Sequence, residues 1–394
     1  MKVTDAKVFV VGNPPPHFGG LYWVFVKLTT DSGVVGYGEV YSVPFHPDVV
    51  ARMIEDVCAR HVIGADPFKI EQLWRRVYGS GYTLRPDTSL MGVLSGIETA
   101  CWDIIGKALD KPVYELLGGR VHERLRAYTY IYPEPDDDTD VYSDPDLAAE
   151  RAATYVAQGF TAVKFDPVGP FSAFDPRQLS LEALDRAETF VTKLRAAVGG
   201  RADLLFGTHG QMTTSSAIRL AKRLEAADPL WLEEPVPPEN VAEMARVARQ
   251  TSIPIATGER LATKYEFAAV LGAQAASILQ MALGRVGGLL EAKKIAGMAE
   301  AHYAQIAPHL YCGPIEGAAN VQISACSPNF LIQESIQTWG GFHAEILTTP
   351  MRWEEGYIIP PEAPGIGVEL NEAVAEQHPY RGDKLHLEML DRPV

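Results

Sequence analysis

Two kinds of hydrophobic pattern divide the chain into an N-terminal part and a longer central part. Early segments alternate apolar and polar residues and are rich in Val, Phe, Tyr and Thr, which is typical of β-strands. Later segments repeat apolar residues every three or four positions, which indicates amphipathic helices. The expected strands are Lys2–Val11, Leu21–Thr30 and Val34–Val40, and the expected helices are Pro47–Val62, Pro67–Tyr78 and Leu90–Leu109. We therefore expect residues 1–124 to form an α+β domain.

From about Leu125 the pattern changes to short apolar runs that alternate with helical stretches. The runs are Leu125–Tyr130, Ala162–Phe165, Leu204–Phe206, Leu230–Leu232, Ile253–Ala256, Ser277–Leu279, Gln305–Ala307 and Phe330–Ile332. The helices expected between them include Leu181–Val198, Ser215–Ala226, Ala242–Arg249, Leu289–His302 and Gly317–Ala325. Such alternation indicates a parallel sheet, and about eight units predict a closed (β/α) barrel over residues 125–355.

The last part of the chain returns to strand and turn signals. Gly356–Ile359 is strand-like, and Pro364–Leu370 is punctuated by glycine. We expect residues 356–394 to leave the barrel and pack on the N-terminal domain. Two segments rich in Gly and Pro, Gly12–Gly20 and Tyr78–Pro86, interrupt that domain and are either lids for an active site or plain surface connections.

Composition narrows the classes of function. The 394-residue chain carries a net charge of -15, and such an acidic surface argues against nucleic-acid binding. No run of about 18 uncharged apolar residues occurs, so we expect no membrane span. The N-terminal residues show no signal-peptide pattern, and the four cysteines are scattered without a CxxC pair. Both observations favour a cytoplasmic protein with reduced thiols.

Polar residues follow several of the apolar runs at the point where each run ends. They are Gly207-Thr208-His209, Glu233, Glu259, His309 and Glu334. Their positions are spaced by about 25 residues, or by twice that where one strand is skipped, which is the length of one barrel unit. Because active sites in such barrels lie at the C-terminal ends of the strands, we expect these side chains to converge on one pocket.

Two of these strand ends carry carboxylates. Glu233 ends one run and Glu259 ends the next. Carboxylates on neighbouring strands repel each other unless a cation lies between them, and hard oxygen ligands of this kind suit Mg²⁺. The alternative is that either carboxylate pairs with an arginine such as Arg260.

Other strand ends supply groups for acid–base chemistry. His309 is suited to act as a general base near neutral pH, although a lone histidine is more often a packed residue. Lys164 and Asp166 are two positions apart, so both face the same side of their strand. Lys164 is suited to stabilise an enolate or carboxylate, and Asp166 to act as a base, a metal neighbour or an anchor for a hydroxyl group. The alternative is an ion pair between these two residues.

The remaining candidate residues are expected to contact the substrate or the metal. His209 is either a general acid or a metal ligand, and Glu334 is expected to hydrogen-bond an enolate oxygen or a substrate hydroxyl. If the two glycine- and proline-rich loops close over the barrel, His17 or Tyr82 would contact the substrate.

Taken together, these motifs resemble the enolase superfamily, in particular the mandelate racemase subgroup and its acid-sugar dehydratases. The resemblance covers nearly the whole chain and rests on Lys164-Phe165-Asp166, Trp231–Pro235, Gly258-Glu259-Arg260, Gly287-Gly288, Pro308-His309, Glu334 and Pro364–Leu370. It implies an α/β fold in which an α+β capping domain covers a modified (β/α)7β barrel of the TIM type. It also implies that Mg²⁺ at Glu233 and Glu259 holds a substrate carboxylate while a base removes the adjacent proton.

Three positions depart from the pattern that the resemblance implies. The family places an aspartate metal ligand at the end of the third barrel strand, where this chain has Gly207, so either His209 or water would substitute or the metal affinity would be weak. The residue aligned with the usual aspartate partner of the histidine base is Met281, so His309 would lack that carboxylate. Asp166 stands where racemases of the subgroup carry a second lysine, which favours a one-sided elimination over two-base racemisation.

The resemblance implies dehydration of a sugar acid as the leading function. In that reaction His309 removes the proton at C2, Lys164 and Mg²⁺ stabilise the enolate, and His209, if free of the metal, protonates the leaving hydroxyl at C3.

Two alternatives stay open. One is a cycloisomerase of an anhydro-sugar acid or lactone, because the GNPPPHFGG and GTHGQ segments resemble those of 3,6-anhydrogalactonate cycloisomerase-like proteins. The other is a non-catalytic barrel that binds sugar acids. In each case we expect a small-molecule ligand and a homo-oligomer, with no nucleic-acid or membrane partner.

Overall fold

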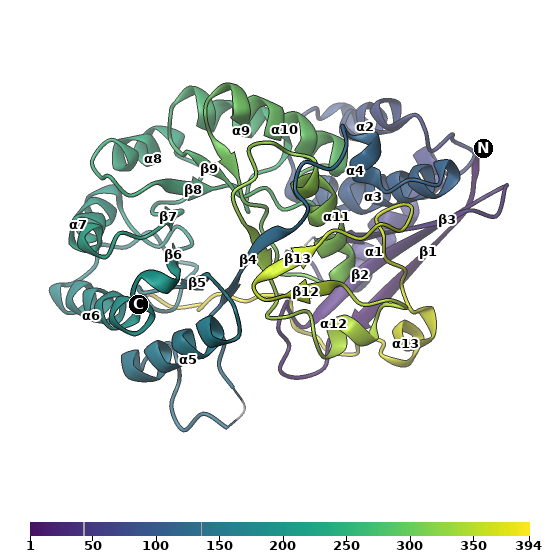
Figure 1. Ribbon diagram of the computed structural model, residues 1–394. Coiled ribbons are helices and arrows are strands. Elements are labelled where there is room, and N and C mark those ends of the chain that lie inside the picture. The colour runs from purple at the N-terminus through teal and green to yellow at the C-terminus, as the bar shows by residue number, and fades with distance from the viewer. Residues whose placement is uncertain (42–43, 135) are drawn as a thin grey trace.

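The computed structural model describes residues 1–394 except 42–43 and 135, and it shows an N-terminal cap beside a barrel (Figure 1). The cap contains the antiparallel sheet β1-β2-β3, formed by Val3–Gly12 (β1), Tyr22–Thr30 (β2) and Val35–Val40 (β3). Its helices are Pro47–Val57 (α1), Ile70–Tyr78 (α2), Thr88–Leu109 (α3) and Val113–Leu116 (α4), with a π-helical turn at Cys58–Val62 and a 3₁₀ turn at Ser80–Tyr82. The cap is thus the α+β domain that the pattern predicts.

Helix α3 lies directly on the sheet of the cap because both surfaces carry glycine. A Cβ atom at Gly38 of β3 would lie only 1.8 Å from the carbonyl oxygen of Gly96 in α3. The helix begins where the Asp87 side chain accepts a hydrogen bond from the Leu90 amide, and it ends at Asp110, whose φ is +53°. Small residues therefore set the distance between these two elements.

The barrel consists of parallel strands that alternate with helices, in the order expected from the sequence. The strands are Leu125–Tyr130 (β4), Ala162–Phe165 (β5), Asp203–Gly207 (β6), Trp231–Glu233 (β7), Ile255–Thr257 (β8), Ile278–Leu279 (β9), Gln305–Ile306 (β10) and Gln333–Ser335 (β11). The helices are Pro145–Ala157 (α5), Leu181–Val198 (α6), Thr214–Leu224 (α7), Val241–Ala248 (α8), Thr263–Gly272 (α9), Leu289–Ala301 (α10) and Pro314–Ala325 (α11), with 3₁₀ turns at Gly199–Arg201 and Glu225–Ala227. Strand β11 pairs with β4 and a bridge joins Ile306 to Phe330, so the ring closes.

The interior of the barrel contains one apolar residue from each strand or from the position next to it. The members of this layer are Tyr128, Ala162, Leu205, Trp231, Ala256, Ile278, Ala307 and Ile332. Tyr128 and Trp231 meet edge to face with ring centroids 5.4 Å apart, and the alanines leave room for these rings. We call this apolar layer the floor of the barrel, and the C-terminal ends of the strands lie above it.

The C-terminal part of the chain first stays with the barrel and then crosses to the cap. After helix Phe342–Glu345 (α12), the hairpin Arg352–Glu354 (β12) and Tyr357–Ile359 (β13) extends the barrel sheet, because β13 pairs antiparallel with β4. Helix Glu372–Gln377 (α13) then packs against β1. The last residues return to the barrel, where Leu390 bridges to Ser172. The expected crossing to the cap is therefore only part of the path of this segment.

Two carboxylates of the cap accept hydrogen bonds from the N-termini of two barrel helices. Glu98 of α3 accepts hydrogen bonds from the amides of Leu289 and Leu290 at the start of α10, at 2.7 and 3.0 Å. Glu39 of β3 accepts hydrogen bonds from the amides of Gly313 and Glu316 at the start of α11, at 2.6 and 2.8 Å. Both carboxylates are buried, and the helix N-termini offset part of the cost of burying them.

Among the described residues, none of the helices combines the length and the apolar character that crossing a membrane requires.

Candidate active site and metal centre

A second layer of side chains lies two residues further along each strand. Because side chains of a strand alternate between its faces, these residues point to the same side as the apolar floor. They are Tyr130, Lys164, Gly207, Glu233, Gly258, Gln280, His309 and Glu334. The strand ends therefore bring the predicted Lys164, Glu233, His309 and Glu334 together on one side of the floor, with Glu259 next to Gly258.

Lys164 stands at the centre of this polar layer. Its Nζ lies 2.7 Å from Oε1 of Glu233 and 3.4 Å from Oε1 of Glu334, and its side chain is buried. Burial alone would lower the pKa of Lys164, but the negative charges of Glu233, Glu334 and Glu259 outweigh it and raise the pKa. Lys164 therefore remains an ammonium at neutral pH.

His309 lies between two carboxylates. Its Nδ1 is 2.9 Å from Oε2 of Glu334 and 3.3 Å from Oε2 of Glu259. Burial lowers the pKa of His309, while the charges of Glu259 and Glu334 raise it, with a net rise. Burial also raises the pKa of Glu334, but Lys164 and His309 bring it down to about 2. Glu334 therefore stays ionised and holds the imidazole ring.

Neither residue that pairs with His309 beyond the end of strand β9 is the aspartate that the resemblance implies. A parallel bridge places Ala282, not Met281, opposite His309. The backbone of Met281 instead accepts a hydrogen bond from the His309 amide at 3.2 Å. The orienting carboxylate comes from Glu334 on the following strand.

His209 and Asp166 form a second pair at the edge of the layer. Nδ1 of His209 lies 3.1 Å from Oδ2 of Asp166, whose other oxygen accepts a hydrogen bond from the Val168 amide at 2.9 Å. Burial lowers the pKa of His209, but the contact with Asp166 and the charge of Glu259 raise it to about 9. The side chain of His209 is 21% exposed, more than those of Lys164 and Asp166, so it lies toward the open side.

The two simpler explanations for these charged residues do not hold in the structure. Arg260 pairs with Glu234, at 2.6 Å between Nη2 and Oε2, rather than with Glu233 or Glu259. Lys164 pairs with Glu233 and Asp166 with His209, so the expected alternative of a Lys164–Asp166 ion pair is wrong.

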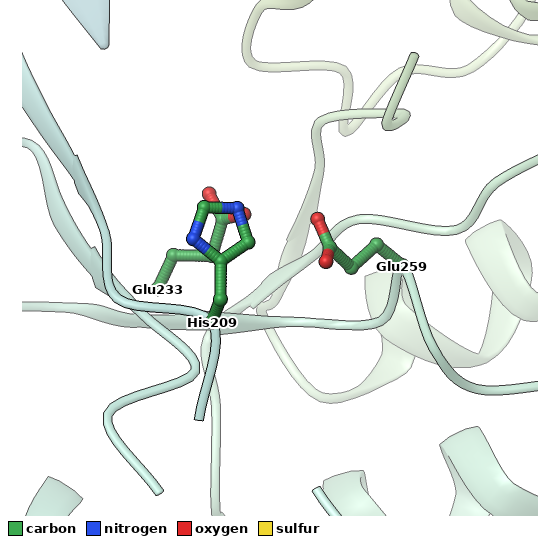
Figure 2. Close-up of side chains that lie close together, drawn as sticks. All are labelled: His209, Glu233 and Glu259. Atoms are coloured by element: carbon green, nitrogen blue, oxygen red, sulfur yellow. The ribbon is translucent and has the colours of Figure 1, made fainter. Parts of the chain in front are cut away.

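His209, Glu233 and Glu259 fit a divalent cation (Figure 2). One ligand atom from each lies within 4.8 Å of the others, and the three side chains face a common point. Among the described residues, Oε2 of Glu259 is buried without a hydrogen-bond partner. The charged neighbour of this oxygen is Nδ1 of His309 at 3.3 Å, and a cation would supply the coordination that no hydrogen bond provides.

Gln280 belongs to this site although we did not single it out. Its Nε2 donates a hydrogen bond to Oε2 of Glu233 at 2.7 Å, and Nε1 of Trp231 donates to the same oxygen at 3.1 Å. These two donors fix the carboxylate plane of Glu233 while Lys164 takes the other oxygen. The period of two from Ile278 would have pointed to Gln280.

The loop Gly12–Gly20 lies against the barrel mouth. The ring of Phe18 stacks on Tyr132, just beyond β4, with centroids 4.3 Å apart. A Cβ atom at Gly19 would lie 2.7 Å from the carbonyl oxygen of Cys312, three residues after His309. His17 is half-buried in this loop, and its Nδ1 lies 2.5 Å from the carbonyl oxygen of Asn13.

The segment Tyr78–Pro86 is placed differently. Tyr78 stacks on Tyr265 of α9 at 6.1 Å, whereas the side chain of Tyr82 is 94% exposed. The structure therefore does not bring Tyr82 to the polar layer, and its contact with substrate stays a prediction that requires this segment to move.

We expect lid variants to weaken substrate binding. His17→Ala should raise KM by about tenfold, the effect of losing one hydrogen bond or contact, and Tyr82→Phe by a smaller factor. The measurement is steady-state kinetics with saturating metal. Tyr303, which is 98% exposed at the end of α10, supplies the control Tyr303→Phe, which should match the wild type. If both lid variants also match the wild type in kcat and KM, the lid interpretation is wrong.

Comparisons with known families match both parts of the chain. Residues 19–118 match the family described as "Mandelate racemase / muconate lactonizing enzyme, N-terminal domain", and residues 147–374 match "Enolase C-terminal domain-like". A structure of mandelate racemase/muconate lactonizing enzyme from Sulfitobacter sp. is 52% identical, with a TM-score of 0.97 over 100% of this chain and 99% of that one. A Labrenzia alexandrii protein provisionally given the same name is 64% identical, with a TM-score of 0.97 over 99% and 100%.

Curated relatives with named activities are more distant in sequence. A D-galactonate dehydratase of Ralstonia nicotianae is 38% identical over 361 residues, which cover 89% of this chain and 90% of the relative. A D-xylonate dehydratase of Haloferax volcanii is 33% identical over 393 residues, which cover 98% and 90%. Both relatives are similar to this chain over the cap and the barrel together.

Proposed function

We propose that this chain, which belongs to the mandelate racemase/muconate lactonizing enzyme family of the enolase superfamily, is a lyase that dehydrates a sugar acid. The observation that carries the proposal is the buried layer in which the base His309, the ammonium of Lys164 and three carboxylates meet at one end of the barrel. The names of the relatives, D-galactonate and D-xylonate dehydratase, support this substrate class. We also propose a homo-oligomer in the cytoplasm, a compartment that suits four free, buried cysteines.

His309 is the proposed base for the proton at C2. A proton beside a carboxylate is weakly acidic, because its loss places a second negative charge on that group. An imidazole ordinarily titrates near neutral pH, and because Glu259 and Glu334 raise the pKa of His309, the neutral form that accepts the proton gains population as the pH rises. Since Nδ1 of His309 faces Glu334 and Glu259, Nε2 is the nitrogen left for substrate. Glu334 then stabilises the imidazolium that forms.

Lys164 is the proposed counter-charge for the enolate. Its pKa is raised by the surrounding carboxylates, so it keeps its proton throughout the reaction and acts by electrostatic attraction. A divalent cation, for which we propose Mg²⁺ at Glu233 and Glu259, would hold the substrate carboxylate and take up part of its developing charge. Gln280 and Trp231 keep the carboxylate of Glu233 in position for that purpose.

The elimination itself is balanced without a further reactant. The electron pair of the C2–H bond moves into the carboxylate and returns to form a C2–C3 double bond as the C3–O bond breaks. The leaving hydroxyl takes one proton and departs as water, and the resulting enol rearranges to a 2-keto acid. Two side chains of the site are suited to supply that proton: His209, if it is free of the metal, or His309 with the proton it has just received.

The experiment is a screen of sugar acids and their lactones with Mg²⁺, read by the mass of each product. We expect a product that is lighter than its substrate by one water, with D-galactonate and D-xylonate among the first compounds tested. A product of unchanged mass from an anhydro-sugar acid or lactone would indicate a cycloisomerase instead. Tight binding without exchange of the C2 proton with solvent would indicate a non-catalytic barrel, and either result would overturn the proposal.

A further inference from the structure

The end of strand β6 has no side chain of its own, and its space is filled by two neighbours. A Cβ atom at Gly207 would lie 2.8 Å from Cε of Lys164 and 3.3 Å from Cε1 of His209. The Lys164 stem and the His209 ring thus occupy the space into which a side chain at position 207 would extend. The atom Cε1 lies between the two ring nitrogens, so the nitrogens of His209 flank this position.

An unusual backbone conformation brings the His209 ring back over the strand end. His209 has a φ of +47°, in the left-handed region, which costs a residue with a side chain about 1–2 kcal/mol. Hydrogen bonds hold the residues on both sides of His209. The amide and hydroxyl of Thr208 both donate to the carbonyl of Glu233, the last residue of β7, and the Gly210 amide donates to the carbonyl of Glu234. These hydrogen bonds hold the turn in place, so the backbone fixes the direction of the His209 ring.

The three potential donors converge from consecutive strand ends (Figure 2). Ligand atoms of His209, Glu233 and Glu259 lie within 4.8 Å of one another. Oε2 of Glu259 is buried with no hydrogen-bond partner among the described residues, and Nδ1 of His309 lies 3.3 Å from it. Nδ1 of His209 lies 3.1 Å from Asp166. A carboxylate on one nitrogen of an imidazole fixes the ring and makes the other nitrogen a better ligand.

We infer that His209 replaces the missing side chain of residue 207 as the third protein ligand of the cation, through Nε2, with Asp166 positioning its ring. The site is then one nitrogen and two carboxylates rather than three carboxylates. Mg²⁺ prefers all-oxygen sites, whereas Mn²⁺ and Co²⁺ accept imidazole readily. The protein should therefore bind Mn²⁺ and Co²⁺ more tightly than Mg²⁺. This inference rests on the metal requirement in the proposed function, but its tests measure binding and not turnover.

The first test is calorimetric titration of metal-free protein with MnCl₂, CoCl₂ and MgCl₂. Wild type should bind Mn²⁺ and Co²⁺ at least about tenfold more tightly than Mg²⁺, which follows from the donor set. His209→Asn should lose at least about tenfold in Mn²⁺ affinity and much less in Mg²⁺ affinity. The Mn²⁺ affinity of Asp166→Asn should fall between those of the wild type and His209→Asn, since loss of an orienting partner typically costs about 10–100-fold. The control is His302→Asn, because His302 is exposed at the end of α10.

The second test needs no variant of His209 and so does not depend on its folding. Pulsed electron paramagnetic resonance of the Mn²⁺-loaded wild type should show a nitrogen coupling that changes when the histidines carry ¹⁵N. The coupling should persist in His309→Asn, which excludes the other histidine of the layer. Absence of an imidazole coupling in the wild type, its loss in His309→Asn, or equal Mn²⁺ affinity of His209→Asn and wild type would each overturn the inference, whether or not a sugar-acid substrate is found.

Discussion

Replacing His309 by asparagine is expected to abolish both turnover and the exchange of the substrate C2 proton with D₂O. General-base catalysis typically contributes about 10²–10⁴-fold, and the asparagine amide cannot accept a proton near neutral pH. Exchange is the sharper measurement, because it reports proton removal even when the later C–O cleavage is blocked. It is followed by NMR of the recovered substrate, after Mg²⁺ and Mn²⁺ have each been tried.

Asp166 supplies the decisive comparison. Asp166 is the second candidate for the base. Its carboxylate lies 3.1 Å from His209, in the pair at the edge of the polar layer. Asp166→Asn should retain some exchange, since it leaves His309 and its carboxylates intact. The matched control for loss of a buried imidazole is His343→Asn, because His343 packs on Trp23 outside the polar layer. Exchange that survives in His309→Asn but is lost in Asp166→Asn would move the base to the Asp166 side and invert the stereochemistry at C2.

Glu233→Gln is expected to lower kcat/KM by at least about 10³-fold and to remove the cation, since both a ligand charge and the partner of Lys164 are lost. The structure explains why an isosteric amide is not a mild change. Oε1 of Glu233 accepts from Lys164 and Oε2 accepts from Gln280 and Trp231. A glutamine must turn its NH₂ group toward one of these donors, which leaves two donors facing each other in a buried site.

The measurement combines kinetics with the metal content of the purified protein. EDTA should inactivate the wild type, and added divalent metal should restore it, whereas Glu233→Gln should recover nothing. Glu300→Gln is the control, because Glu300 is exposed near the end of α10, away from the polar layer. Full activity of the wild type after rigorous metal removal would contradict both the metal requirement and the assignment of Glu233.

Much of this site could be predicted because it repeats with the strands. Once the apolar runs define the floor of the barrel, a step of two residues leads from Ala162 to Lys164, from Trp231 to Glu233 and from Ala307 to His309. The fold follows from the same alternation, and the family match confirms the capped (β/α)7β barrel. Gln280 was missed although it obeys this rule, because strand β9 has only the two residues Ile278–Leu279 and its end carries no charge to draw notice.

Other features depend on contacts that no periodic pattern encodes. The pairing of His209 with Asp166 follows from one residue with a positive φ, held by hydrogen bonds to β7. His309 finds its carboxylate on the following strand rather than the preceding one, which only the closed ring reveals. The pairing of β13 with β4 was likewise not foreseen, because an antiparallel strand added outside a parallel barrel leaves no distinct mark in the sequence.

Glu39 and Glu98 make the cap a poor candidate for exchange between relatives. Each supplies the acceptor that a barrel helix lacks at its own N-terminus, and α11 in turn holds the backbone of His309, since Asn320 donates to its carbonyl oxygen at 2.9 Å. A transplanted cap without an acid at position 39 would leave the amides of Gly313 and Glu316 unpaired, beside the loop that carries the base. Recombination between such proteins is therefore constrained to breakpoints that keep each acid with the helix it completes. New substrate specificities should then arise more readily by substitutions within the cap loops than by exchange of the whole cap domain.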